Sequence, residues 1–436
     1  MKLRNLLHIR EGDIHIIGSI TPPFFFRVSE IMENFVRLCD NNSIEASLNL
    51  LKIKYSPTEF VDFQQRLEKV KDKLFVDNDY KEAQEIDISS KVHILTLNVT
   101  RKCNLKCDYC FEDSEYRKLG NMSFEIAKKA IDTFFTTPTN TPGWVIIFTG
   151  GEPLFNYDLI KKVVKYIDNK SLTVKYNIKT NATLLNDEKM DFLIKNNFKI
   201  QVSLDGNKKA HDTHRKFVNG KGTFEIVDKS IRRLIEKGYG SNVSISGTLT
   251  HQTAQYVDNS YAQFNSYPEM KSYSLKNVMS NSHCQYGFNL DDYKIVYNSN
   301  LKNNKHLLEQ GKKLMEENHN IDICGVGIWN MAIDVDGKIY PCYRMCGDSK
   351  YVISDIESLK LPLKLPQNLE NIYRLESNSQ CSKCYLINVC KRGCYSDKLI
   401  YHYDSNKCFQ SKKTIIEEIV YNELINKKTY LSLDIV

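Results

Sequence analysis

Residues 103–110 read CNLKCDYC, and this short stretch says most about the fold and chemistry of the 436-residue chain. Thiolates such as those of Cys103, Cys107 and Cys110 are ligands for zinc or for an iron–sulfur cluster. A structural zinc site needs four protein ligands, and residues 102–149 contain no histidine and no fourth cysteine. Three ligands on one loop therefore favour a cubane cluster with one open iron over a zinc site that is completed from elsewhere.

The use of cysteine indicates a reducing compartment. The chain has 13 cysteines, an odd number, and it is far longer than a typical disulfide scaffold. Its first 18 residues carry Arg4, Arg10, Glu11 and Asp13, where a signal peptide needs an uninterrupted apolar segment. Clustered cysteines under these conditions point to metal binding. We therefore expect a cytoplasmic metalloprotein.

Composition excludes several other classes of protein. Hydrophobic residues make up 42% of the chain and charged residues 26%, which is typical of a globular protein and not of a disordered or collagenous one. The net charge of +7 is too small to indicate a nucleic-acid partner. No apolar run approaches the ~18 residues that a membrane span needs.

Strand-like and helical patterns alternate after residue 92, which predicts βα units and a parallel sheet, open or closed as a partial barrel. The predicted strands are 93–99, 144–148, 174–179, 198–203, 242–248 and 273–275. The predicted helices are 123–135, 157–168, 188–196 and 224–237. Ligands of such sheets bind at the carboxyl ends of the strands, where the motifs described below also lie.

The N-terminal 85 residues have a different pattern and no sharp motif. Residues 13–17 alternate as a strand does, and residues 29–38 have apolar side chains at helical spacing. Ser56, Pro57 and Glu59 form a helix start with a capping box, and this helix should run to about Leu74. We expect a small α+β domain with its strands before its helices.

The cysteine stretch resembles the signature of the radical S-adenosylmethionine (SAM) enzymes, including Tyr109 before the last cysteine. Residues 149–153 (TGGEP) resemble the family's Gly-Gly-Glu motif, which alone would be typical of a turn. Residues 179–185 (KTNATLL) resemble its Thr-Asn-Gly-Thr stretch with Ala182 in place of glycine, and residues 202–215 resemble a strand and loop that contact SAM. The cofactor-binding residues implied by the resemblance are Tyr109, Gly150, Gly151, Glu152, Asn181, Ser203 and Arg215.

In this family a [4Fe–4S] cluster on the three cysteines chelates SAM through its open iron. An electron then cleaves SAM to methionine and a 5′-deoxyadenosyl radical. Glycines would let the backbone approach the methionine amine, and Glu152 would pair with its ammonium. For Asn181, Ser203 and Arg215 the alternative is a role as turn or cap groups, which is common for polar residues after strands.

A second cysteine-rich region has the spacings Gly337-x4-Cys342 and Cys381-x2-Cys384-x5-Cys390-x3-Cys394, with Cys324 before and Cys408 after them. It resembles the SPASM domain, the auxiliary-cluster extension of radical SAM enzymes. By spacing alone it could also be a zinc ribbon. The resemblance implies two further [4Fe–4S] clusters, hence three in all. The implied ligands are Cys324, Cys342 and Cys394 for the first auxiliary cluster, and Cys381, Cys384, Cys390 and Cys408 for the second. Cys346 is either a further ligand of the first auxiliary cluster or an ordinary loop residue, and Cys39 and Cys284 are expected to be buried thiols.

The sequence pattern and the resemblance together imply five regions. They are a leader-peptide recognition domain of winged-helix type (1–85), a radical SAM core with a partial (β/α)6 barrel (92–280), a helical connector (281–321), a SPASM domain (322–410) and a C-terminal helix (411–436). The leader would bind by strand addition to an exposed sheet edge, although the first region could also be a packing domain that binds no peptide.

Two enzymatic functions follow from the resemblance. Sulfatase-maturing relatives typically carry an aspartate base directly after the Gly-x4-Cys cysteine, but Tyr343 stands there in this chain. A maturase of a ribosomally made precursor peptide, which installs a thioether or carbon–carbon cross-link, is therefore the leading hypothesis, with a flavodoxin or ferredoxin as electron donor. The alternatives are a sulfatase-maturase-like oxidase and, from another class, an iron–sulfur electron carrier. The catalytic base is not identified.

Overall fold

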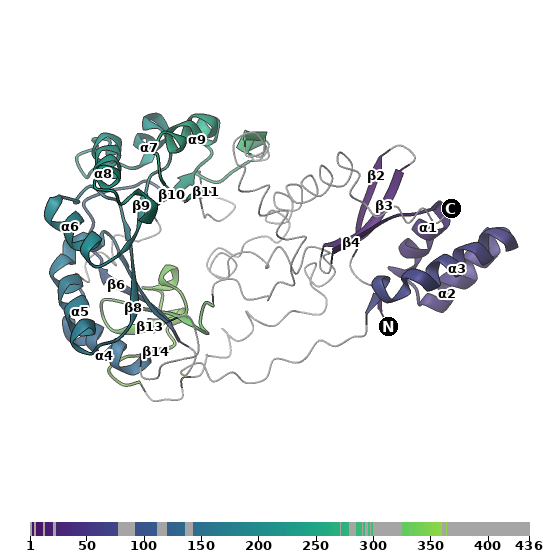
Figure 1. Cartoon of the computed structure of the whole chain (residues 1–436), viewed down its shortest axis with the longest axis horizontal. Helices are drawn as coiled ribbons and strands as arrows, with labels where there is room; N and C mark the ends of the chain where they lie inside the picture. The colour runs from purple at the N-terminus through teal and green to yellow at the C-terminus, as the bar shows by residue number, and fades with distance from the viewer. Residues whose placement is uncertain are drawn as a thin grey trace.

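The computed structural model of the chain describes residues 2–3, 6–11, 14–20, 23–76, 92–110, 120–135, 143–270, 272–278, 285–289, 291–292, 295–296, 298–299, 325–359 and 363 (Figure 1). The predicted C-terminal helix, most of the predicted connector and six of the seven cysteines assigned to the auxiliary clusters lie outside these residues. The predictions for those segments therefore stay predictions.

A nine-stranded open sheet forms the centre of the larger body. Six of its strands are parallel and follow one another in chain order, so each is joined to the next by a crossover connection. They are β6 (Ile94–Thr100), β7 (Trp144–Gly150), β8 (Val174–Thr180), β9 (Lys199–Ser203), β10 (Val243–Leu249) and β11 (Ser272–Asn277). The predicted parallel α/β sheet is thus confirmed, and each predicted strand overlaps an observed one.

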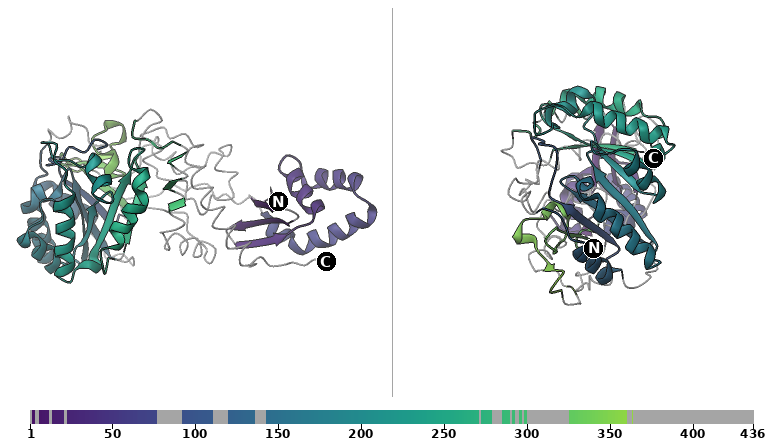
Figure 2. Two further views of the ribbon diagram at one scale, coloured as in Figure 1. Left: turned by 90° about the horizontal axis from the view of Figure 1, so that it is seen from above. Right: turned by 90° about the vertical axis from the view of Figure 1, so that its left-hand side faces the viewer.

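Helices cover one face of this sheet (Figure 2). They are α4 (Phe124–Phe134), α5 (Tyr157–Asn169), α6 (Asp187–Lys195), α7 (Lys208–His214), α8 (Phe224–Glu236) and α9 (Val257–Asn265). The sequence predicted four of them, whereas α7 and α9 were not predicted. Both are short, and α7 carries only one buried apolar side chain, Ala210, so it has no apolar stripe for the pattern to reveal.

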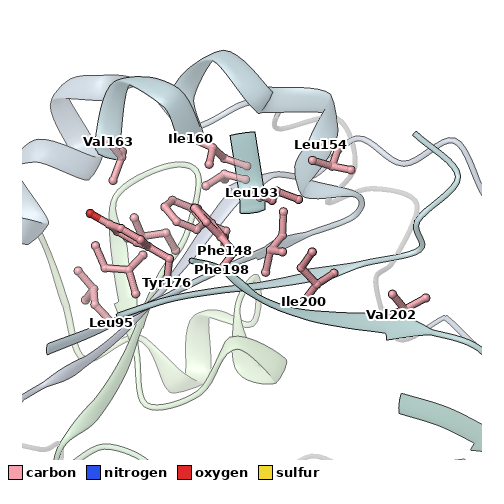
Figure 3. Close-up of a cluster of buried hydrophobic side chains, with 14 of the residues drawn as sticks. Leu95, Phe148, Leu154, Ile160, Val163, Tyr176, Leu193, Phe198, Ile200 and Val202 are labelled. Atoms are coloured by element: carbon pink, nitrogen blue, oxygen red, sulfur yellow. The ribbon is translucent and has the colours of Figure 1, made fainter. Parts of the chain in front are cut away.

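The main core lies between the sheet and these helices (Figure 3). Alternate residues of the strands, such as Phe148 and Ile178, are fully buried against helix residues such as Ile160. Aromatic rings from neighbouring strands stack within it, with 5.1 Å between the ring centroids of Tyr176 and Phe198. Because successive side chains of a strand point to opposite faces, the residues between them lie on the other face of the sheet. We call that face, opposite α4–α9, the inner face.

Three strands of the C-terminal region extend the sheet beyond β6. Strand β12 (Asn330–Ile333) pairs with β6 in parallel, and β13 (Lys338–Tyr340) and β14 (Ser354–Asp355) continue in antiparallel order. Asp334, at the end of β12, forms a buried ion pair with Arg101 and accepts a hydrogen bond from Asn98 at 3.0 Å. Removing one partner of such a buried pair typically costs about 3–5 kcal/mol. The C-terminal region is therefore fixed to the loop that carries the first cysteines.

The N-terminal residues form a smaller body with its own core. Three antiparallel strands, β2 (Leu7–Glu11), β3 (Ile14–Ile20) and β4 (Pro23–Arg27), precede three helices. The helices are α1 (Glu30–Cys39), α2 (Ile44–Lys54) and α3 (Pro57–Leu74), and short strands β1 (Lys2–Leu3) and β5 (Phe75–Val76) pair with each other. The predicted order of strands before helices is confirmed.

The predicted capping box of α3 is also present. The backbone N–H of Glu59 donates to the Ser56 hydroxyl, and the Glu59 carboxylate accepts from the Ser56 backbone N–H at 3.0 Å. The sequence did not predict β2, β4 or α2. No described helix is both long and apolar enough to cross a membrane.

Candidate functional site

The first cysteine motif lies on a loop that follows β6 and is held in place by the chain after α7. The backbone N–H of Lys106 donates to the Lys216 carbonyl at 2.8 Å, and Leu105, which is 1% exposed, forms a β-bridge with Phe217. Cys103, Cys107 and Cys110 carry no disulfide. The structure thus places all three predicted thiols on this one loop.

The surroundings of Cys103 suit a thiolate that binds a cluster. Its Sγ accepts from the backbone N–H of Leu105 at 3.4 Å and from Asn181 Nδ2 at 3.9 Å. Burial raises the pKa of the Cys103 thiol to about 12, so this thiol stays protonated unless a metal takes the proton's place. Hydrogen bonds to the sulfurs are one of the ways in which a protein tunes an iron–sulfur cluster.

The three thiols do not converge on one point. Within the described ranges, no three Cys, His, Asp or Glu side chains lie close enough together to hold a single metal ion. Each thiolate of a [4Fe–4S] cluster binds a different iron, so its ligands need not meet as those of a single ion do. The three cysteines on this loop fit a cluster of that kind.

Gly150 and Gly151 are required by the close approach of two backbone segments. A Cβ on Gly150 would lie 2.2 Å from the Thr100 carbonyl oxygen, and one on Gly151 would lie 2.5 Å from that of Lys102. The Gly151 N–H donates to Thr100 O and the Glu152 N–H donates to Lys102 O, both at 2.9 Å. These glycines thus let the start of the cysteine loop approach β7 closely, and an approach of the methionine amine to them stays a prediction.

Glu152 is a fully buried carboxylate at the carboxyl end of β7. It accepts hydrogen bonds from Thr180 Oγ1 and the Asn181 N–H, both at 2.7 Å, and from the Leu154 N–H at 3.2 Å. Burial raises the pKa of Glu152 to about 7, against the lowering effect of these three hydrogen bonds. A buried carboxylate of this kind is suited to receive an amino group.

Asn181 connects Glu152 to the cysteine loop. Its backbone bonds the Glu152 carboxylate, while its side chain donates to Asn104 Oδ1 at 3.0 Å and reaches the Cys103 sulfur. The next residue, Ala182, has φ +61° and is completely buried. Positive φ costs a non-glycine residue energy, which accounts for the glycine that the family usually has there.

Tyr109 and Arg215 meet on a second carboxylate, that of Asp205. The Tyr109 hydroxyl donates to Asp205, and Arg215 Nε lies 3.0 Å from the same carboxylate. The Arg215 guanidinium also lies 5.5 Å from the centre of the Tyr109 ring, while the ring of His214 packs edge-on against it. This network fixes the cysteine loop to the chain after β9, and a contact of Tyr109 or Arg215 with a cofactor stays a prediction.

The remaining predicted residues are more widely distributed. Ser203 ends β9, next to Ser246 of β10, and is not part of either network. Cys342 and Cys346 lie in the C-terminal region and pack together in a small cluster with Met345. The other cysteines assigned to auxiliary clusters, Cys324, Cys381, Cys384, Cys390, Cys394 and Cys408, lie outside the described residues.

The site also contains residues that the sequence analysis did not select. Asp205 and Thr180 make the central hydrogen bonds, and both follow or end a strand next to a selected residue, which is a usable signal. Asp334 gave no such signal, because its partner Arg101 lies 233 residues away.

Comparisons with known proteins find similarity in the part of the chain that contains these residues. The Radical SAM superfamily profile matches residues 97–263. An uncharacterised protein of Methanocaldococcus jannaschii is 36% identical over 166 residues, which cover 38% of this chain and 55% of that protein. A cysteine-type anaerobic sulfatase-maturating enzyme of Clostridium novyi is 24% identical over 330 residues, which cover 68% of this chain and 86% of that enzyme.

Two solved structures have a similar fold. The first, native anSMEcpe with bound AdoMet, has a TM-score of 0.63 at 23% identity and covers 77% of this chain and 98% of its own. The second, Streptococcus suis SuiB bound to precursor peptide SuiA, has a TM-score of 0.52 at 17% identity and covers 93% of this chain and 97% of its own. The resemblance stated from the sequence is thereby confirmed over residues 97–263, which match the Radical SAM superfamily profile.

Proposed function

We propose that the chain is a radical SAM maturase that modifies a ribosomally made precursor peptide. The observation that supports this most directly is the set of hydrogen bonds around Glu152. A fully buried carboxylate there shares Asn181 with the first thiol of the cysteine loop. SAM would bind with its amino group at Glu152 and its sulfonium beside the cluster on Cys103, Cys107 and Cys110.

In this proposal, the residues of the chain bind and orient SAM and shield the site from water. Cys103, Cys107 and Cys110 would hold a cluster that, with SAM bound, would supply the radical chemistry for abstracting a hydrogen from a peptide carbon. Glu152 would fix the amino acid end of SAM, and Asn181 would hold the Cys103 thiolate. Asp205 would hold Tyr109 and Arg215 so that the loop keeps its shape, and the Arg101–Asp334 pair would keep the C-terminal region in place over it.

Three observations favour a peptide maturase over a sulfatase-maturase-like oxidase. Tyr343 stands where the sulfatase-maturing relatives have an aspartate base. The N-terminal body has a three-stranded sheet whose edge strands, β2 and β4, offer a place for strand addition by a leader. The likeness to SuiB, whose structure holds the precursor peptide SuiA, extends over 93% of this chain. Three clusters, a small iron–sulfur or flavin electron donor and the cross-link chemistry belong to the same proposal.

The test combines SAM cleavage with a peptide. Reduced, reconstituted protein should form 5′-deoxyadenosine from SAM, and a precursor peptide encoded next to its gene should lose two hydrogen atoms on incubation. Formation of 5′-deoxyadenosine without any change in the peptide, but with oxidation of a sulfatase-derived peptide, would favour the oxidase. An electron carrier would form no 5′-deoxyadenosine at all.

Replacing Glu152 with glutamine should weaken SAM binding while leaving the iron content unchanged. A charge-assisted hydrogen bond contributes about 1.5–3 kcal/mol, so the dissociation constant of SAM should rise roughly tenfold to 150-fold. Equilibrium dialysis with labelled SAM measures the change. Glu125→Gln, at an exposed position on α4, is the matched control and should bind SAM as the wild type does. Equal affinities in the Glu152 and Glu125 variants would contradict the assignment.

The same variant should also change how stability depends on pH. The pKa of Glu152 is raised in the folded protein, so its contribution to stability is complete below the usual glutamate pKa and is lost as the pH rises through about 7. From about pH 5 to about pH 8, the wild type should lose about 2–3 kcal/mol more of its unfolding free energy than Glu152→Gln does. Urea unfolding of the SAM-free proteins, followed by the fluorescence of Trp144 and Trp329, reports on the larger body alone.

A further inference from the structure

The inner face of the sheet carries polar side chains next to the Glu152 pocket. On β8, Tyr176 and Ile178 are buried against the helices, as Figure 3 shows for Tyr176, so Asn177 and Lys179 lie on the inner face. Lys179 is half-buried and pairs in register with Gln201 of β9. A cationic side chain thus lies on the face of the sheet opposite the helices.

Lys179 is also close, along the strand, to the residues of the proposed SAM site. The next residue, Thr180, donates to the Glu152 carboxylate, and the residue after that, Asn181, reaches the Cys103 sulfur. Two residues of a strand span about 6–7 Å, so the Cα of Lys179 is about that far from the Cα of Asn181. Lys179 therefore lies within two residues of both of these site residues.

The ammonium of Lys179 lies over an aromatic ring. Its Nζ lies 3.9 Å from the ring centroid of Tyr343, in the short helix η5 (Tyr343–Met345), and the Arg344 guanidinium lies 6.0 Å from the same centroid. In the part of the chain that the structure describes, Lys179 forms no ion pair with an aspartate or glutamate. A cation–π contact orients an ammonium without neutralising its charge. Lys179 therefore keeps a positive charge that an anionic ligand can pair with.

We propose that Lys179 binds a carboxylate of the substrate peptide, with the Tyr343 ring holding its ammonium in position. This inference rests on the proposed function, and it names the substrate class more closely: a peptide with an aspartate or glutamate near the modified residue. The carboxylate of SAM is the other source of the same chemistry. A peptide is favoured because Tyr343 comes from the C-terminal region, so the ammonium lies where a ligand would contact both the parallel strands and that region.

The test uses two peptide pools that differ in a single charge. Each is an acetylated, amidated pentapeptide with neutral residues at four randomised positions, and the central residue is glutamate in one pool and glutamine in the other. Equilibrium dialysis against the oxidised, SAM-loaded holoprotein measures binding without turnover. The wild type should retain the glutamate pool about tenfold more strongly, because a charge-assisted hydrogen bond is formed with that pool alone.

Two substitutions at position 179 and one control locate the effect. Lys179→Met should remove the preference for glutamate, and Lys179→Arg should keep it. Lys175→Met changes an exposed lysine four residues earlier on the same strand and should keep the preference as well. A purely structural lysine would lower the retention of both pools alike in Lys179→Met, and this result would overturn the inference.

The remaining outcomes are also decisive. Equal retention of the two pools by the wild type, including no retention of either, would overturn the role of Lys179. A tenfold loss of SAM affinity in Lys179→Met with an unchanged preference would assign the lysine to the SAM carboxylate and overturn it too. Failure of the proposed function is recognised separately, because reduced wild-type protein would then form no 5′-deoxyadenosine from SAM, whereas the dialysis result does not depend on SAM cleavage.

Discussion

Replacing Cys103, Cys107 and Cys110 together with alanine should abolish SAM cleavage and remove about one third of the iron. The three cysteines would bind one of three proposed [4Fe–4S] clusters, so about four of about twelve irons per chain should be lost. Without that cluster no electron reaches the sulfonium of SAM, and no 5′-deoxyadenosine should form. Iron and sulfide analysis and liquid chromatography of the reaction mixture measure the two effects.

The location of the three cysteines makes a local effect the expected one. Their loop is bound to the rest of the body by backbone hydrogen bonds, such as that of Lys106 with Lys216, and by Leu105, none of which the substitutions remove. Cys39→Ala is the matched control, because Cys39 is a half-buried thiol at the end of α1 in the N-terminal body. That variant should keep its iron and its activity. Zinc in place of iron in the anaerobically purified wild type would refute the cluster assignment.

Local signals in the sequence predicted much of the fold. The capping box at Ser56 and the start of α5 at Tyr157 lie where the pattern places them, because caps and apolar periodicity depend on residues only three or four positions apart. Helix α2 escaped prediction because its apolar residues do not lie on one side. Leu51 is buried, whereas Leu50 and Ile53 are exposed.

The candidate site was predictable to the extent that it consists of motif residues after strands. Cys103, Glu152 and Asn181 were selected in this way, and the structure brings them together. The partners that hold them were less accessible to sequence reasoning. The pairs Tyr109–Asp205 and Arg101–Asp334 join residues 96 and 233 positions apart, and only the completed sheet brings such residues into contact.

Loss of the N-terminal body should abolish peptide processing but spare SAM cleavage without peptide. The two bodies have separate cores: no residue of the cluster that contains Phe35, Phe63 and Leu67 belongs to the cluster beneath the nine-stranded sheet. Deleting residues 1–85 therefore removes the proposed leader-binding edges without opening the core around the SAM pocket. The expected results are unchanged 5′-deoxyadenosine formation and no modified precursor peptide by mass spectrometry.

A point variant makes the same test in the full-length chain. Phe63 is 1% exposed, and its ring centroid lies 5.2 Å from that of Phe35, so Phe63→Ala should destabilise the N-terminal body by about 3–5 kcal/mol. Val61→Ala, on the same helix but 52% exposed, should change stability by no more than about 0.5 kcal/mol and should process the peptide normally. A truncated protein that still modified the full-length precursor at the wild-type rate would make residues 1–85 a packing domain. Loss of SAM cleavage in Phe63→Ala would instead show that the two bodies depend on each other to fold.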